Sequence, residues 1–210
     1  MSRPPCQLYL ISPPLLGPDF ATRLARAIDA GPVTAFQLRL KDMPDDDVLR
    51  AAETLLPVCA ARDVAFILND RMDLAKACGA DGVHLGQSDG DPRDARQLLG
   101  PSAQIGVTCH DSRHLAMEAG EKGADYVAFG AFHPTTTKPS HYRPAPELLT
   151  WWSTLFELPC VAIGGITPEN APPLIDAGAD FLAVCNAIWV GDEAQAAAAF
   201  GAVMGQGKNG

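Results

Sequence analysis

The segment QLRLK at residues 37–41 places two cationic side chains beside an apolar run. Gln37, Arg39 and Lys41 alternate with leucines, so an extended strand would point all three to one face. Buried cations are costly unless an anion meets them, and a phosphate or diphosphate ligand is one such anion. A structural salt bridge is the other interpretation, and this segment alone favours neither.

Two carboxylates stand at the ends of consecutive apolar runs. Asp70 ends the run AFILND, and Asp89 follows the run GVHLGQ. If both runs are neighbouring strands, the two carboxylates approach each other, and beside diphosphate-binding cations they would form a magnesium site with few protein ligands. An acid/base pair is a second interpretation, and a helix cap by Asp70 is a third. We expect Arg71 to pair with a carboxylate and hold its loop.

Later segments offer groups that bind an oxyanion. Thr135, Thr137 and Lys138 lie in FHPTTTKP, where hydroxyls, backbone N–H groups and an ammonium could surround a phosphate. The run CVAIGG ends at Gly165, and Pro168 is expected to open a helix there.

The last run, FLAVCNA, ends with Cys185 and Asn186, where a second helix N-terminus is expected. Glycines and helix N-termini after the seventh and eighth strands commonly bind phosphate in barrels. Earlier in the chain, His84 faces inward by alternation and could shape a ring pocket. Thr108 can donate one hydrogen bond to a ligand. His110 could act as a general acid or base, and a packed, hydrogen-bonded histidine is the alternative.

Positioning these residues requires alternating strands and helices. Short apolar runs, rich in β-branched and aromatic residues, alternate with amphipathic segments such as 20–30 and 45–61, as is typical of buried parallel strands. The eight runs are QLYLIS (7–12), AFQLRL (35–40), AFILND (65–70), GVHLGQ (82–87), QIGVTC (104–109), YVAFGAF (126–132), CVAIGG (160–165) and FLAVCNA (181–187).

A short repeat supports this organisation. Gly-Ala-Asp precedes a run three times, at Gly79, Gly123 and Gly178, where glycine fits the positive φ that follows a helix. The pattern predicts an α/β protein, a single-domain (β/α)8 TIM barrel over residues 1–205, with a flexible tail at 206–210. The alternative is an open doubly wound sheet, which would often carry GxGxxG after its first strand.

The composition excludes several other classes of protein. Hydrophobic residues make up 47% and charged residues 20%, which excludes a disordered, collagen-like or coiled-coil chain. A net charge of −9 argues against nucleic acid or an anionic membrane as a partner. Six cysteines without a CxxC pair, no signal peptide and no long apolar run predict a soluble cytoplasmic protein with reduced cysteines.

The ordered motifs resemble those of the thiamine-phosphate synthase family. The matching segments are QLRLK (37–41), LNDR (68–71), DGVHLGQSD (81–89), IGVTCH (105–110), FGAFHPTTTKP (129–139), AIGGITPEN (162–170) and AVCNAI (183–188). The resemblance covers nearly the whole chain and implies a TIM-barrel transferase of thiamine biosynthesis. Such an enzyme joins hydroxymethylpyrimidine diphosphate to a thiazole phosphate and releases diphosphate with Mg²⁺. A homodimer is a further implication of the family.

The family pattern, carried over position by position, sorts the candidate residues into groups. The pyrimidine diphosphate would be bound by Gln37, Arg39, Lys41, Asn69 and Thr108. Mg²⁺ would be held by Asp70 and Asp89. The thiazole phosphate would be bound by Thr135 and Thr137 with the backbone at Gly165, Cys185 and Asn186. Lys138 would reach the diphosphate, so Arg39, Lys41 and Lys138 would be the catalytic cations. Diphosphate loss would be dissociative, which needs charge neutralisation and alignment rather than a nucleophile.

Some positions depart from the family pattern, and two alternatives stay open. Asn186 and Thr108 stand where the family usually has serine, and Leu40 and Ser88 stand where it often has an acid. The related thiazole tautomerase family shares the fold and a motif like that at His110, but it typically lacks the second magnesium aspartate and the TxTK loop. The first alternative is therefore a tautomerase that transfers a proton at His110. The second is a phosphate-ligand binding module without catalysis.

Overall fold

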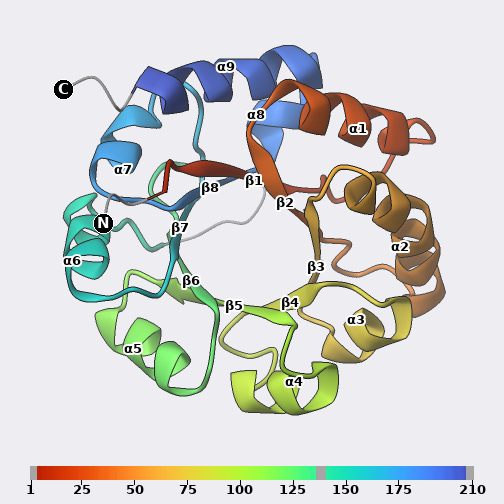
Figure 1. The fold of residues 1–210 in the computed structure, drawn as a ribbon, viewed down its shortest axis with the longest axis horizontal. Helices are drawn as coiled ribbons and strands as arrows, with labels where there is room; N and C mark the ends of the chain where they lie inside the picture. The colour runs from red at the N-terminus through yellow and green to blue at the C-terminus, as the bar shows by residue number, and fades with distance from the viewer. Residues whose placement is uncertain (1–3, 136–140, 207–210) are drawn as a thin grey trace.

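Parallel strands close into a barrel in their order along the chain. The computed structural model describes residues 4–135 and 141–206, and each strand pairs with the next, with β8 returning to β1 (Figure 1). The strands are β1 (Gln7–Ile11), β2 (Val33–Leu38), β3 (Ala65–Asn69), β4 (Gly82–Leu85), β5 (Gln104–His110), β6 (Tyr126–Gly130), β7 (Cys160–Ile163) and β8 (Phe181–Val184). The closed order confirms the TIM barrel and rules out the open sheet.

Helices surround the barrel on its outside (Figure 1). They are α1 (Phe20–Ala30), α2 (Asp45–Ala60), α3 (Met72–Cys78), α4 (Pro92–Leu99), α5 (Arg113–Glu121), α6 (Glu147–Leu155), α7 (Pro172–Asp176), α8 (Asn186–Trp189) and α9 (Glu193–Gln206). The last helix, α9, packs against α1 and completes the ring. Within residues 4–135 and 141–206, no helix has both the length and the apolar character that crossing a bilayer requires.

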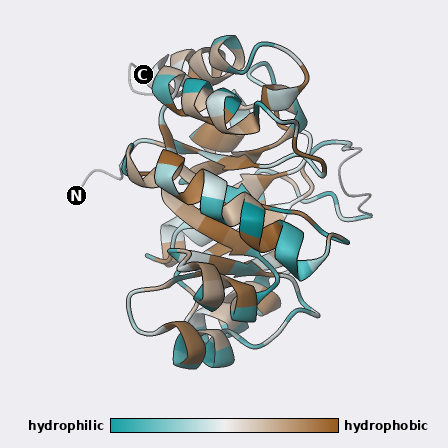
Figure 2. Ribbon diagram, turned by 90° about the vertical axis from the view of Figure 1, so that its right-hand side faces the viewer, coloured by the Kyte–Doolittle hydropathy of each residue, from teal (hydrophilic) through white to brown (hydrophobic). Residues whose placement is uncertain are grey.

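The alternation of side chains along each strand builds two cores. In β1, Leu8 and Leu10 face the helices, whereas Tyr9 and Ile11 face the barrel interior, and all four are buried. Each leucine that leaves water in this way stabilises the fold by about 1.5–3 kcal/mol. Figure 2 shows the result: hydrophobic strands lie inside, and the helices carry hydrophilic outer faces.

The Gly-Ala-Asp repeats join pairs of neighbouring strands by hydrogen bonds at the amino-terminal end of the barrel. The three glycines have positive φ values of 73°, 88° and 97°, as expected after a helix. Each aspartate accepts a hydrogen bond from a backbone N–H of the preceding strand: Asp81 from Phe66 at 2.7 Å, Asp125 from Ile105 at 2.7 Å and Asp180 from Cys160 at 2.8 Å. The repeat therefore joins β3 to β4, β5 to β6 and β7 to β8.

The expected helix start at Pro168 is wrong. Pro168 lies in a turn, and α7 begins at Pro172. A helix that started at Pro168 would need the N–H of residue 172 as a donor to the carbonyl of residue 168, but residue 172 is a proline and has no N–H.

Some strands also end earlier than the apolar runs suggest. Because β8 ends at Val184, Cys185 occupies the N-cap position of α8, and Asn186 is the first residue of that helix.

Candidate active site

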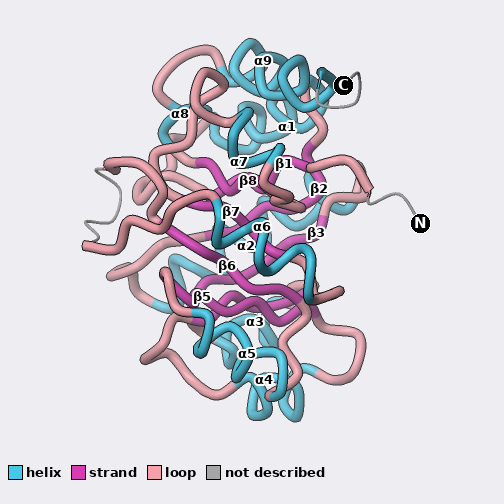
Figure 3. Tube along the Cα trace, turned by 90° about the vertical axis from the view of Figure 1, so that its left-hand side faces the viewer, coloured by secondary structure: helices cyan, strands magenta, loops and turns pink. Residues whose placement is uncertain are grey.

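A cavity of about 590 Å³ opens at the carboxyl ends of the strands, the end at which the loops after the strands gather (Figure 3). Most residues proposed from the sequence line it: Gln37, Arg39, Lys41, Asn69, Asp70, His84, Thr108, Thr135, Gly165, Cys185 and Asn186. Asp89 adjoins this lining, because its carboxylate accepts a hydrogen bond from the backbone N–H of Gly86, a lining residue, at 3.1 Å. Thr137 and Lys138 lie outside the described residues.

Opposite charges meet at one side of the cavity mouth. Lys41 Nζ lies 3.1 Å from Asp70 Oδ2, and Asp70 is the more buried partner, with 17% of its side chain exposed against 48% for Lys41. Burial raises the pKa of Asp70, and the nearby Asp89 carboxylate raises that pKa further, although Lys41 opposes both effects. The two carboxylates predicted to approach each other therefore do interact.

The loop that carries Asp70 is held from outside the cavity. Arg71 forms ion pairs of 2.7 Å with Asp45 at the start of α2 and with Asp73 in α3, as expected for a residue that ties its loop down. Asp70 itself has a φ of 62°, a left-handed conformation uncommon for non-glycine residues. Asp70 does not cap α3, since the residue at the N-cap is Arg71.

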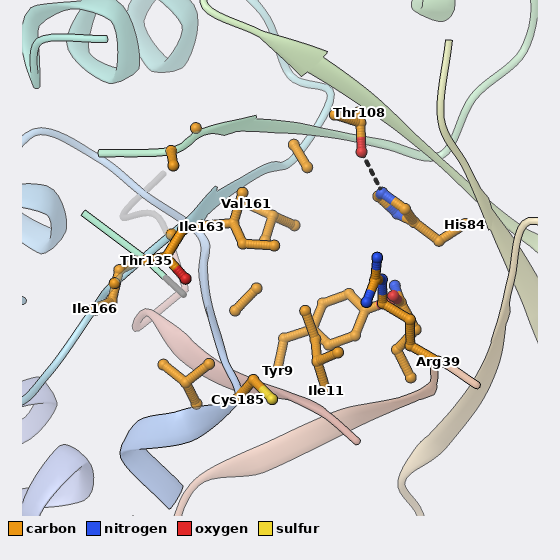
Figure 4. A pocket seen from close by; sticks show the side chains of 18 of the residues that line it. Tyr9, Ile11, Arg39, His84, Thr108, Thr135, Val161, Ile163, Ile166 and Cys185 are labelled. Carbon is orange, nitrogen blue, oxygen red and sulfur yellow. Dashed lines mark hydrogen bonds between the residues drawn. The ribbon is translucent and has the colours of Figure 1, made fainter. Parts of the chain in front are cut away.

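Arg39 differs from Lys41 in its partners. Its backbone N–H donates to Ser12 Oγ at 2.8 Å, which fixes the chain where β2 ends. Its side chain extends into the cavity on the same side as His84 (Figure 4). The structural salt bridge considered for this segment is present at Lys41, but among residues 4–135 and 141–206 no carboxylate pairs with Arg39.

A continuous chain of hydrogen bonds crosses the barrel interior below the cations. It runs Gln37 Nε2 to Tyr9 Oη (2.9 Å), Tyr9 Oη to Tyr126 Oη (2.9 Å), Tyr126 Oη to His84 Nδ1 (3.1 Å) and His84 Nε2 to Thr108 Oγ1 (2.8 Å). We call these five residues the relay. Gln37, Tyr9, His84 and Thr108 line the cavity, so the relay connects two parts of its wall.

Glycines after β7 bring the chain close to the segment after β6. Gly164 and Gly165 have φ values of 103° and 61°. A Cβ at Gly165 would overlap the carbonyl oxygen of Pro134 and would stand 3.0 Å from Cβ of His133. Asn170 holds the turn by donating to the Gly165 carbonyl at 3.0 Å. This close packing brings the segment that leads to Thr135 against the turn that precedes Thr167, and both threonines line the cavity.

Sequence reasoning missed the apolar wall of the cavity. Val161, Ile163 and Ile166 lie across the cavity from His84 and Thr108, with Tyr9 and Ile11 below (Figure 4). The signal was available for β1 and β7, because alternation along each strand assigns these side chains to the interior. Such a wall suits a flat, weakly polar ring.

An aromatic contact closes another side of the cavity. The His110 ring stacks on Tyr142, with centroids 4.2 Å apart and planes 20° apart. His110 has a φ of 55° and lines the cavity together with Tyr142. His110 therefore packs on Tyr142 and also lines the cavity, so the structure is compatible with both roles considered from the sequence. Tyr142 was not among the predicted residues, and its position follows the undescribed segment 136–140, which gave no periodic signal.

Comparisons with known proteins point to one family. The family model described as "Thiamine monophosphate synthase" matches residues 8–188. A thiamine-phosphate synthase of Rhodospirillum centenum is 64% identical over 185 residues, which are 88% of this chain and 89% of that protein. A thiamine-phosphate synthase of Erythrobacter litoralis is 61% identical over 93% of this chain and 94% of that protein.

A solved structure is similar over almost the whole chain. The thiamine phosphate pyrophosphorylase of Pyrococcus furiosus superposes with a TM-score of 0.85 at 31% identity, covering 97% of each chain. A 3-hexulose-6-phosphate synthase superposes with a TM-score of 0.67 at 20% identity, a likeness that concerns the barrel fold alone.

Proposed function

The chain belongs to the thiamine monophosphate synthase family of transferases, and from that premise we propose how its cavity joins hydroxymethylpyrimidine diphosphate to a thiazole phosphate. The observation that carries the proposal is the convergence of Arg39, Lys41, Asp70 and Asp89 at one mouth of the cavity. Cations and carboxylates together suit a diphosphate that a divalent cation accompanies.

The pyrimidine ring would lie between the apolar wall and the relay. Val161 and Ile163 offer contact to its face, and Gln37 and Thr108 offer hydrogen-bonding groups to its edge. The thiazole phosphate would bind at the other end, where Thr135 and the backbone of Gly165 and Asn186 line the cavity. Both substrates then share one cavity, which aligns the thiazole nitrogen with the pyrimidine methylene carbon.

The reaction needs no protein nucleophile. The bond between the methylene carbon and the diphosphate oxygen breaks, and the diphosphate leaves with the electron pair. The thiazole nitrogen then gives its lone pair to the methylene carbon, so the products are thiamine phosphate and diphosphate. Arg39 and Lys41 disperse the negative charge that develops on the leaving oxygen. Lys138, which the family resemblance predicts to reach the diphosphate, lies outside the described residues.

The donor set fits Mg²⁺. Asp70 and Asp89 supply hard oxygen ligands, and their mutual repulsion, which adds to burial in raising the pKa of Asp70, is what a divalent cation would relieve. Bound Mg²⁺ would supply further charge neutralisation for the diphosphate. Besides dispersing charge, Lys41 would then hold the Asp70 carboxylate in place through their ion pair.

The experiment is a diphosphate-release assay with both substrates and Mg²⁺. We expect Asp89→Ala to abolish Mg²⁺-dependent release while thermal unfolding changes little. Asp94→Ala is the matched control, because Asp94 is an exposed acid on α4. A purified wild-type protein that releases no diphosphate, or an Asp89→Ala variant with wild-type activity, would contradict the proposal.

Two further expectations concern the setting of the enzyme. Within residues 4–135 and 141–206, which hold all six cysteines, no disulfide bond is formed, and this supports a reducing compartment such as the cytoplasm. A homodimer is expected from the family, and light scattering on the purified protein measures it.

A further inference from the structure

Tyr126 is the central member of the relay, although it does not line the cavity. Its hydroxyl is bonded to Tyr9 on one side and to His84 on the other. Its ring stacks on His84, with centroids 5.6 Å apart, and meets the ring of Tyr9 edge-on at 5.9 Å. Tyr126 therefore acts on the cavity through its neighbours.

The barrel holds the Tyr126 ring in a fixed position. A Cβ at Gly106 in β5 would overlap the Tyr126 ring, so the glycine leaves room for it. The ring is buried, and 8% of the residue is exposed. Because the ring cannot move far, its hydroxyl stays within reach of His84 Nδ1.

The proton of each hydroxyl decides the direction of the relay. Gln37 Nε2 donates to Tyr9. In the arrangement in which each group accepts one hydrogen bond and donates the next, the one hydroxyl proton of Tyr9 goes to Tyr126. Tyr126 then donates to His84 Nδ1, which must be unprotonated. A neutral imidazole carries its proton on the other nitrogen, so His84 Nε2 donates to Thr108. The proton of Thr108 is left to face an acceptor in the cavity.

Burial keeps both tyrosines in the form that this direction needs. Burial raises the pKa of Tyr9 to about 12 and raises the pKa of Tyr126 well above its usual value. Both hydroxyls therefore stay protonated at neutral pH, and each passes on a single hydrogen bond.

We propose that Tyr126 is a positioning residue that selects the Nε2-protonated tautomer of His84 and thereby makes Thr108 a hydrogen-bond donor to the pyrimidine substrate. The inference deepens the proposed function and rests on it for the identity of the ligand. It links Gln37 and Thr108, because the two tyrosine hydroxyls and the imidazole of His84 connect them. The two ends thus recognise one donor and acceptor pattern together.

The first test observes the His84 tautomer in the ligand-free protein. Long-range ¹⁵N–¹H spectra distinguish protonated from unprotonated ring nitrogens, and the His84→Asn variant assigns the signal. We expect wild-type His84 to carry its proton on Nε2 alone. A wild-type His84 protonated on Nδ1 would overturn the proposal without any further variant.

The second test compares two tyrosine variants. Tyr126→Phe removes one oxygen and leaves the ring beside Gly106, so we expect a mixture of His84 tautomers. We also expect kcat/KM for the pyrimidine diphosphate to fall on the order of tenfold, while KM for the thiazole phosphate is unchanged. Tyr9→Phe should keep the wild-type tautomer, because Tyr126 can still donate to His84. Trp152→Phe controls for stability, since it removes a buried bond to the Leu158 carbonyl outside the barrel.

The outcomes separate the relay from the proposed function. An unchanged His84 tautomer in Tyr126→Phe would refute the proposal, whatever the activity. An altered tautomer with an unaltered kcat/KM for the pyrimidine diphosphate would refute the recognition role of Thr108. If wild-type protein releases no diphosphate but the tautomer responds as expected, the proposed function fails and the assignment of Tyr126 to His84 stands.

Discussion

Gly165→Ala tests whether the turn after β7 positions the thiazole phosphate. The new methyl group meets two costs. At a φ of 61°, a Cβ costs about 1–2 kcal/mol of backbone strain. It also overlaps the Pro134 carbonyl oxygen, so the segment leading to Thr135 must move by on the order of 1 Å.

The strain and the displacement have different readouts. Strain alone lowers the unfolding temperature by roughly 2–8 °C in a domain of this size. A displacement of about 1 Å in a positioning segment can lower the rate on the order of a hundredfold. We therefore expect kcat/KM for the thiazole phosphate to fall steeply and KM for the pyrimidine diphosphate to stay near its wild-type value. Initial rates with each substrate varied in turn measure both.

Gly79→Ala is the matched control. Its φ of 73° brings similar strain, but within the described residues no atom lies within 4 Å of the new Cβ. We expect Gly79→Ala to lose stability and to keep activity. The reasoning is refuted if Gly165→Ala binds the thiazole phosphate normally, or if Gly79→Ala impairs that binding equally.

Two further substitutions address charge. Burial and Asp89 raise the pKa of Asp70 above 3.8 in the folded protein. The folded state therefore loses stability as the pH rises through this raised pKa, because Asp70 ionises less readily there than in the unfolded chain. Below the pKa of Asp70 in the unfolded chain, the effect is absent. Urea unfolding should therefore show Asp70→Asn gaining stability relative to wild type from about pH 4 upward while losing Mg²⁺-dependent activity; a constant difference across pH would contradict this. Asp125→Ala removes bonds to the Ile105 N–H at 2.7 Å and to Arg96 at 2.6 Å. It should cost about 1.5–3 kcal/mol of unfolding free energy and leave kcat intact, and an inactive but stable variant would contradict a purely structural role.

Much of the fold and of the cavity lining could be predicted from the sequence. Strands that are buried on both faces are continuously apolar, so each apolar run predicted a strand. A barrel of parallel strands brings the carboxyl ends of these strands to one rim. Gln37, Arg39 and Asn69 could be assigned to that rim for this reason alone. The Gly-Ala-Asp repeat could likewise be recognised as the turn between a helix and the next strand, because glycine tolerates the positive φ that follows a helix.

The sequence could not supply contacts between strands that are not neighbours. Tyr9 and Tyr126 are 117 residues apart, and their hydroxyls meet only because the closed barrel points both side chains to its axis. The aspartates of the repeat were visible, but their bonds to the preceding strands depend on the register of the barrel.

Periodicity along one segment therefore determined the class of fold, the face of each strand and the residue types at the rim. The tertiary structure alone decided which of these side chains touch, that the five relay residues form one chain of hydrogen bonds, and that Pro168 lies in a turn. The physical reason is that alternation and propensity are properties of neighbouring residues, whereas distances across a barrel follow from its closure and stagger.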